Sequence, residues 1–199
     1  SEYHKFKKSL VNSIPNKYFE VGLKLIYNIE KSVSNYLKGQ FLSAASVGGM
    51  SIAGLLLLNF FGANITLVIF IGIIAGLANL IPLVGPFVGM VPALLIAFMN
   101  NLGNDAATSH MFLGTIPSPF FSIDIIFMFL IVQQIEGNLI TPALVGKSVG
   151  LHPMLVMIVL LIGGTLLGPL GMLFAVPASG VIKVIIKEIA FVRKNAHLL

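Results

Sequence analysis

The longest stretch without charge decides what this chain can fold into. The 66 residues between Lys38 and Asp105 contain no Asp, Glu, Lys or Arg, and residues 148–182 form a second such stretch. One helical crossing of a bilayer needs about 20 apolar residues, so the first stretch has room for three crossings and the second for a hairpin. Only 10% of the residues are charged, against roughly 25% in soluble domains. A soluble enzyme, a nucleic-acid binder and a disordered chain are therefore excluded, and the sequence predicts an integral membrane protein.

The charges gather at the two ends of the chain. Residues 1–38 carry a net charge of +4 and residues 183–199 a net charge of +3, whereas residues 39–182 carry −2. Basic flanks favour the cytoplasmic side, so both termini of this segment are expected there, with an even number of crossings between them. Three regions follow: a basic amphipathic helical region at 1–38, cytoplasmic or interfacial, a transmembrane domain at 39–187 and a cytoplasmic basic tail at 188–199.

Six hydrophobic segments are expected inside the transmembrane domain. They are 40–61, 65–81, a segment at 83–99 broken by Pro86 and Pro92, a short one at 123–135, and a hairpin of 153–167 and 170–186 about Gly168 and Pro169. Residues 100–122 contain no Lys or Arg, which suits the non-cytoplasmic side. Several segments are too short for a straight crossing, so we expect some to be broken or re-entrant. The predicted fold is an all-α polytopic bundle preceded by an amphipathic helix.

Glu136 is the most informative ionisable residue. It follows an apolar run within the string QQIEGN, which also supplies Gln133, Gln134 and Asn138. A carboxylate at membrane depth is costly unless it is paired, protonated or hydrated, so it commonly faces a cavity or a partner. One interpretation is a substrate or cation contact, or a protonation site. The other places QQIEGN at the membrane edge, with Glu136 paired to a lysine or capping a helix.

Further polar and helix-breaking residues complete the predicted site. Asn79 opens the string NLIPLVGP, and His152 is either an interfacial or helix-cap residue or a proton relay. Carbonyls freed by proline are tolerated only inside protein or beside a watery cavity. The positions expected to break helices or line a cavity are Pro82, Gly85, Pro86, Pro92, Pro153, Gly168, Pro169 and Pro177.

Catalytic and cofactor motifs are not found. GKS at 146–148 lacks the glycine that a phosphate-binding loop needs five residues earlier, since that position is Thr141. No Ser, His and Asp form a nucleophile motif, no His pair has metal-ligand spacing, and there are no cysteines. We therefore predict a protein that is not an enzyme, with no cofactor, no metal site and no nucleic-acid partner.

Four sequence blocks resemble the bacterial autoinducer-2 exporter family. They are YLKGQFL (36–42), GLANLIPLVGPFVGMVPALL (76–95), QQIEGNLITPALVGKSVGLHPM (133–154) and GGTLLGPLGMLFAVPASGVIKV (163–184). The resemblance covers about residues 20–190. It implies the C-terminal portion of a multi-pass permease of the bacterial inner membrane, with further hydrophobic helices upstream, and a homo-oligomer.

The expected function is transport of a small polar solute such as autoinducer-2. In this interpretation Glu136, Gln133, Gln134 and Asn138 contact the solute, because amides both donate and accept hydrogen bonds. The alternative is a sodium or proton antiporter of the same family, in which Glu136 binds the cation. A non-transporting membrane scaffold is the third possibility. The expected partners are the lipid bilayer, a small polar solute or monovalent cation, and further copies of the chain.

Overall fold

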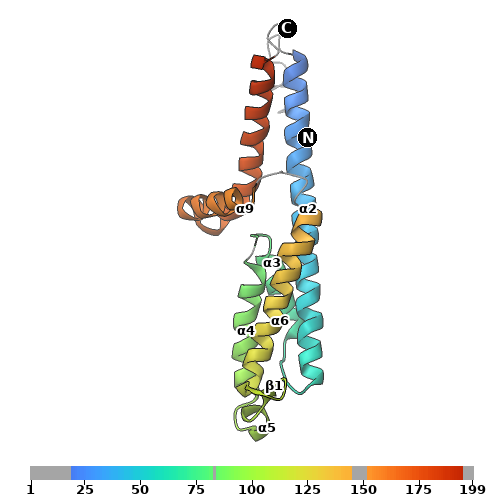
Figure 1. Ribbon diagram of the computed structural model, residues 1–199, viewed down its shortest axis with the longest axis vertical. Coiled ribbons are helices and arrows are strands. Elements are labelled where there is room, and N and C mark those ends of the chain that lie inside the picture. The colour runs from blue at the N-terminus through green and yellow to red at the C-terminus, as the bar shows by residue number, and fades with distance from the viewer. Residues whose placement is uncertain (1–18, 83, 145–151, 195–199) are drawn as a thin grey trace. The chain divides into compact units, whose positions relative to one another are not determined.

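The computed structural model describes residues 19–82, 84–144 and 152–194, and these are almost entirely helical (Figure 1). The chain divides into two compact units. One unit contains residues 38–147, and the other contains residues 1–37 and 148–199. Helix α2 (Phe19–Phe60) contributes to both, so each unit is described by itself below.

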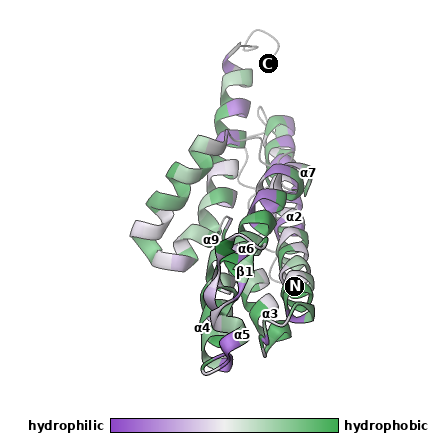
Figure 2. Ribbon diagram, turned by 60° about the horizontal axis from the view of Figure 1, so that its bottom comes forward, coloured by the Kyte–Doolittle hydropathy of each residue, from purple (hydrophilic) through white to green (hydrophobic). Residues whose placement is uncertain are grey.

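In the part of the chain that the structure describes, three helices are long and apolar enough to cross a membrane. They cover Phe19–Phe60, Pro119–Leu144 and Met154–Phe191. Many of their large apolar side chains are exposed, which is unusual for a soluble protein, and Figure 2 shows hydrophobic residues along most of the helical ribbon. These helices confirm the predicted all-α, polytopic membrane fold.

The amphipathic segment and the first crossing form one helix. α2 runs without interruption for 42 residues. No proline lies between Phe19 and Phe60, so no position in this range lacks the backbone N–H that the helical ladder needs. The helical backbone therefore continues unchanged past Lys38, where the side chains change from partly charged to apolar.

The next two helices are short. α3 (Val68–Ala78) has 11 residues and α4 (Gly85–Asn100) has 16, both below the length of a straight crossing. Pro86 lies in the first turn of α4, where its missing N–H costs nothing. Pro92 was expected to break the 83–99 segment, but it lies inside an uninterrupted α4. The break instead falls between α3 and α4, where residues 79–82 and 84 form turns and a bend.

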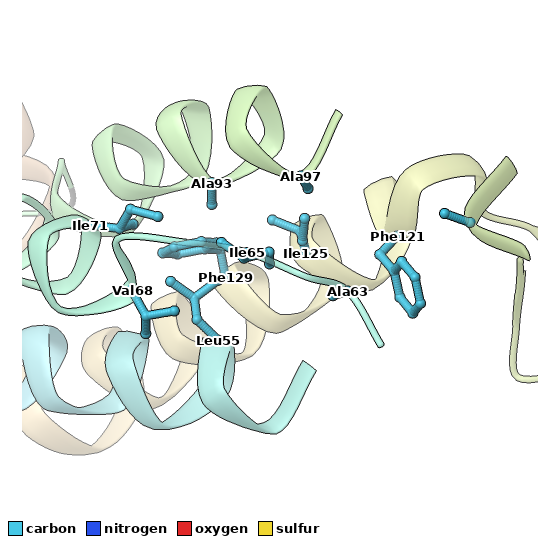
Figure 3. Close-up of a cluster of buried hydrophobic side chains, with 11 residues drawn as sticks. Leu55, Ala63, Ile65, Val68, Ile71, Ala93, Ala97, Phe121, Ile125 and Phe129 are labelled. Atoms are coloured by element: carbon cyan, nitrogen blue, oxygen red, sulfur yellow. The ribbon is translucent and has the colours of Figure 1, made fainter. Parts of the chain in front are cut away.

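An apolar core joins α2, α3, α4 and α6 (Ser122–Ile135) (Figure 3). Small residues on α4 face larger ones, since Ala93 and Ala97 point toward the side on which Ile125 and Phe129 of α6 lie. The full cluster of buried side chains is Leu55, Ala63, Ile65, Val68, Ile71, Ala93, Ala97, Ala107, Phe121, Ile125 and Phe129. This packing holds α3 and α4 against α2 and α6.

A compact connection follows α4. It contains α5 (Asp105–Thr108), a two-stranded antiparallel hairpin of β1 (Met111–Phe112) and β2 (Ile116–Pro117), and a single turn, η2 (Pro119–Phe121). In the hairpin Met111 pairs with Pro117 and Phe112 with Ile116. Asn101, fully buried, ties the start of this connection to the turn between α2 and α3, because its Nδ2 donates to Ala63 O and to Ala97 O, both at 2.8 Å.

Replacing Asn101 with Ala is expected to lower the free energy of unfolding by about 1–3 kcal/mol, because the buried Ala63 carbonyl loses its side-chain donor. Thermal unfolding in detergent would measure the change. The control is Asn100→Ala, whose side chain also bridges α4 to this turn but is exposed to solvent. Equal destabilisation by the two variants would contradict the role given to burial.

In the other unit, α9 (Pro153–Lys194) folds back on itself. Leu167 and Gly168 leave helical geometry, and Gly168 has a φ of 62°, which favours glycine. Gly163 and Gly171 face each other so closely that a Cβ on either would strike the other's backbone. This confirms the predicted turn at Gly168 and Pro169 (Figure 1). Pro177 lies inside the second limb, which Lys24 of α2 joins through an ion pair to Glu188 at 3.4 Å.

Candidate functional site

Glu136 is a buried carboxylate inside the 38–147 unit. Its side chain is 1% exposed, and it opens η3 (Glu136–Ile140), a short π-helix that follows α6 directly. Among the described residues it forms no ion pair with any basic group. The pairing with a lysine that the second interpretation expected is not found among the described residues. A charge held this way needs other compensation.

Two hydroxyl groups supply part of that compensation. Ser43 Oγ on α2 lies 3.3 Å from Glu136 Oε1, and Thr141 Oγ1 donates to the same oxygen at 2.5 Å. Thr141 begins α7 (Thr141–Leu144), five residues after Glu136. In an α-helix, residues five apart lie about 140° apart around the axis. The π-helical turn brings them onto one side, and so it is the local backbone that places the Thr141 hydroxyl on Glu136.

Asn79 extends this network to a third helix. Asn79 follows the last residue of α3, is fully buried, and donates from Nδ2 to Ser43 Oγ at 3.2 Å. Gln40 Nε2 on α2 donates in turn to the Asn79 carbonyl at 2.5 Å. We call Gln40, Ser43, Asn79, Glu136 and Thr141 the Glu136 cluster. Ser43 of α2 and Thr141 of α7 bond to the carboxylate directly, and Asn79 at the end of α3 bonds to Ser43.

Three buried oxygen atoms, two in the Glu136 cluster and one on Gln133 in the preceding turn, have no hydrogen-bond partner. They are Glu136 Oε2, Asn79 Oδ1 and Gln133 Oε1. All three are acceptors, and each hydrogen bond named above goes to a different atom. Unpaired buried acceptors are costly, so the cluster is suited to receive a proton, a cation or the hydroxyl groups of a solute.

Gly85 makes room for Asn79. A Cβ at Gly85 would lie 2.5 Å from Asn79 Cβ and 2.6 Å from the Ala75 carbonyl. Pro82 lies in the turn that separates the two helices, and Pro86 is buried in the first turn of α4. The Pro/Gly-rich string therefore acts on the site by ending α3 at a buried Asn79 and letting α4 start close beside it.

The structure brings together only some of the residues expected at the site. Glu136 and Asn79 are linked through Ser43, and Gln133 lies half-buried one turn before Glu136. Gln134 and Asn138 are exposed and bond to each other at 3.2 Å, so they lie away from the cluster. Pro92 lies two turns along α4. His152 and the predicted break residues after it belong to the other compact unit: Pro153, Gly168, Pro169 and Pro177.

His152 acts there as a helix cap. Its Nδ1 accepts from the Met154 backbone N–H at 3.3 Å, and its carbonyl accepts from Leu155 N at 2.9 Å. The structure thus favours the cap over the proton relay for this residue.

Gln40, Ser43 and Thr141 were not predicted from the sequence. Gln40 and Ser43 are polar residues three apart at the start of a long charge-free run, and this spacing placed them on one helix face. That signal was available but weak, because Ser is common in membrane helices. Thr141 had no signal, since helical periodicity places it on the opposite side from Glu136.

Comparison with known proteins gives a consistent result. Residues 1–191 match a family model described as AI-2E family transporter. The chain is 32% identical over 180 residues to "Putative transport protein YueF" and 35% identical over 178 residues to "Putative transport protein YrrI", both of Bacillus subtilis. It is also 34% identical over 71 residues, 36% of this chain and 21% of the relative, to "AI-2 transport protein TqsA" of Escherichia coli.

The chain spans less than half the length of the first two relatives. The alignments cover 90% and 89% of this chain, but 43% of YueF and 44% of YrrI. No solved structure matches.

Proposed function

Because this chain belongs to the AI-2E family of transporters, we propose that it forms part of a permease that moves a small polar solute, such as autoinducer-2, through the Glu136 cluster. One observation carries the proposal: a buried carboxylate with no basic partner in the described part of the chain lies beside another unpaired acceptor, inside a membrane protein of a transporter family. Autoinducer-2 appears in the name of one relative, TqsA.

Hydroxyl-rich solutes suit this set of acceptors. Glu136 Oε2 and Asn79 Oδ1 can each accept a hydrogen bond from a further donor. A solute hydroxyl can donate to either oxygen, and the carboxylate bond is the stronger because its acceptor is charged. Three separate helices hold these residues, so small movements between α2, α3 and η3 would open or close the cluster.

Cation/proton antiport is the second candidate. It is favoured by Glu136 Oε2, which accepts no hydrogen bond although Oε1 accepts two. A proton or a monovalent cation would give Oε2 the partner that it lacks, and neither needs a large cavity. In this mechanism Glu136 alternates between carrying a proton and carrying the cation.

We propose the following membrane context from charge distribution and family membership. The protein lies in the bacterial inner membrane, with both ends of this segment in the cytoplasm and residues 100–122 on the opposite side. Residues 1–38 and 188–199 flank a transmembrane domain at 39–187, and copies of the protein associate into a homo-oligomer.

Flux measurements on the intact protein in proteoliposomes test these proposals. Movement of autoinducer-2 that does not depend on sodium supports the polar-solute permease. Exchange of sodium for protons, with a clear dependence on pH, supports the antiporter. If neither occurs, the protein is a membrane scaffold and the proposed function is wrong.

Thr141→Val is expected to lower transport about ten-fold or more, because valine keeps the shape of threonine but cannot donate to Glu136 Oε1. Losing one hydrogen bond to a charged group costs about 1.5–3 kcal/mol, which corresponds to roughly ten-fold or more in an equilibrium at the site. Thr141→Ser is the matched control, since it retains the hydroxyl. Initial rates in proteoliposomes would measure both, and equal rates for the two variants would contradict the role of the hydroxyl.

A further inference from the structure

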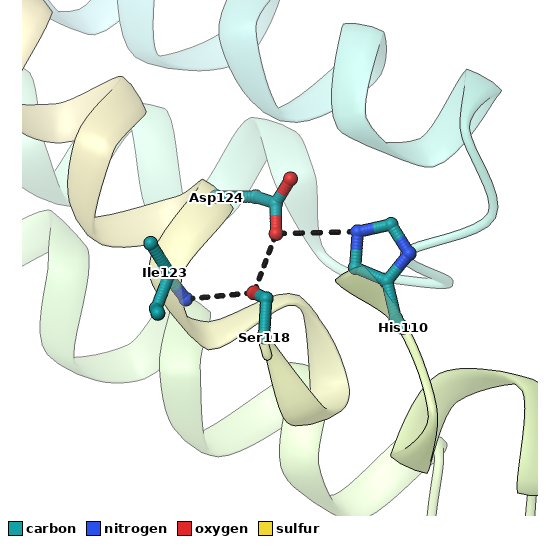
Figure 4. Close-up of polar contacts among 4 residues, drawn as sticks. All are labelled: His110, Ser118, Ile123 and Asp124. Atoms are coloured by element: carbon teal, nitrogen blue, oxygen red, sulfur yellow. Dashed lines mark hydrogen bonds and ion pairs between the residues drawn. The ribbon is translucent and has the colours of Figure 1, made fainter. Parts of the chain in front are cut away.

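The loop between α4 and α6 contains a second polar cluster, formed by His110, Ser118 and Asp124 (Figure 4). Ser118 N donates to His110 O at 2.9 Å and closes the base of the β1–β2 hairpin. Ser118 Oγ donates to Asp124 Oδ2 at 2.6 Å and accepts from Ile123 N at 3.0 Å. His110 Nε2 lies 3.3 Å from the same carboxylate oxygen. The hairpin is thus attached to the first turn of α6 at its base.

This arrangement is not that of a hydrolytic triad. The Ser118 hydroxyl gives its hydrogen to Asp124 and not to the imidazole, so no base is placed to activate it. His110 Nε2 makes no hydrogen bond of good geometry, although it lies within ion-pair distance of Asp124. The attraction between them therefore depends mainly on whether the imidazole carries a positive charge.

His110 faces few other charged groups. Asp124 of α6 is its partner, and the exposed Asp105 of α5 is the other carboxylate of this loop. The residues of α2, α4 and η2 beside the loop carry no charge, since no Asp, Glu, Lys or Arg occurs at 39–104 or 106–123.

Other contacts hold the loop only in part. The His110 ring stacks on Phe121 with centroids 3.8 Å apart. Phe120 and Phe121, which connect the hairpin to α6, have positive φ values of 56° and 58°, a conformation that non-glycine residues adopt at a cost. Surrounding contacts must maintain that conformation, and the His110–Asp124 contact is one of them.

We propose that residues 109–121 form a cap whose attachment to α6 is strengthened when His110 is protonated. Histidine is the side chain whose charge ordinarily changes between about pH 5 and 8. The ion pair with Asp124 exists at the acidic end of this range and is lost as the pH rises. With the topology proposed above, the cap lies on the non-cytoplasmic side and responds to external pH. This proposal concerns a region apart from the Glu136 cluster and does not require a particular solute.

A spin label on the hairpin tests the proposal. Thr115 is exposed at the hairpin turn, and these 199 residues contain no cysteine, so Thr115→Cys accepts a label selectively in the intact protein once other cysteines are replaced. We expect the label to be less mobile near pH 5.5 than near pH 8.5, the two ends of the histidine range. His110→Gln and Asp124→Asn are each expected to abolish this difference.

Two further variants make the result specific. His110→Phe keeps an aromatic ring for stacking on Phe121 without a charge, so its label should be as mobile at both pH values as the parent's at the higher one. His152→Gln, in the other compact unit, should retain the full pH response. A parent label of unchanged mobility, or a pH response that survives both His110→Phe and Asp124→Asn, would overturn the proposal.

Discussion

Glu136→Gln is expected to lower transport by the intact protein at least about ten-fold, the size of effect that follows when one charge-specific contact of about 1.4 kcal/mol or more is removed. Glutamine has the shape of glutamate but cannot bind a cation as a carboxylate does or release a proton. Its amide can still accept from Ser43 and Thr141 through its oxygen. The loss would therefore report the missing charge and not a collapsed site.

Stability should move in the opposite direction. Glu136 is 1% exposed and forms no ion pair among the residues described, so neutralising it removes a desolvated charge. We expect the unfolding temperature of Glu136→Gln in detergent to be equal to or above that of the parent. A variant that is both inactive and strongly destabilised would show that Glu136 is a structural residue.

The matched control is Asp105→Asn. Asp105 is an exposed carboxylate of the same unit and lies outside the Glu136 cluster. Its replacement should leave the transport rate unchanged. Transport by Glu136→Gln that equals the parent's across pH and sodium gradients would remove Glu136 from the mechanism, while flux by the parent would still support the permease.

Gly76→Ala is expected to lower the free energy of unfolding by about 1–3 kcal/mol, because the added methyl group has no space. A Cβ at Gly76 would lie 2.8 Å from the Ala44 carbonyl and 3.3 Å from Gly48 Cα. Both are backbone atoms, which cannot rotate away as a side chain can. The helices α2 and α3 would have to separate, close to where Ser43 and Asn79 meet.

Gly49→Ala is the matched control for this substitution. Gly49 is also helical, but a Cβ there meets nothing within 4 Å. Alanine has the higher helix propensity, so this variant should be neutral or more stable by up to about 1 kcal/mol. Thermal unfolding of both variants would measure the effect. Equal shifts in the same direction would show that the contact between α2 and α3 is looser than described.

The sequence predicted the class of fold because composition alone excludes a water-facing surface. It also identified Glu136 and Asn79, which are conspicuous in an apolar chain. Gln134 and Asn138 were expected beside Glu136 because QQIEGN was treated as one polar unit. In a helix, however, neighbouring residues point to different sides. Glu136 points inward and Gln134 and Asn138 outward, and the length of the apolar run could not reveal which side faces the protein.

Pro92 illustrates a different limit. A proline within a helix costs one backbone hydrogen bond, and whether the helix ends there depends on what packs around it. α4 is held between α3 and α6 with Ala93 and Ala97 in the core, and it continues through Pro92. Pro169 also lies in an apolar segment, but there the helix is interrupted. The preceding Gly168 adopts the positive φ that turns the chain, which glycine does at little cost.

The sequence by itself therefore determined that the chain is a helical membrane protein and that Glu136 is unusual, because the charge and hydropathy of each segment decide whether it can enter a bilayer. Its four sequence blocks identified the transporter family. Only the tertiary structure decided which residues surround Glu136. Gln40 and Ser43 come from α2, Asn79 from the end of α3, and Thr141 from beyond a π-helical turn. Contacts between residues 36 to 93 positions apart depend on how helices pack and where their backbones deviate, and no local pattern contains that information.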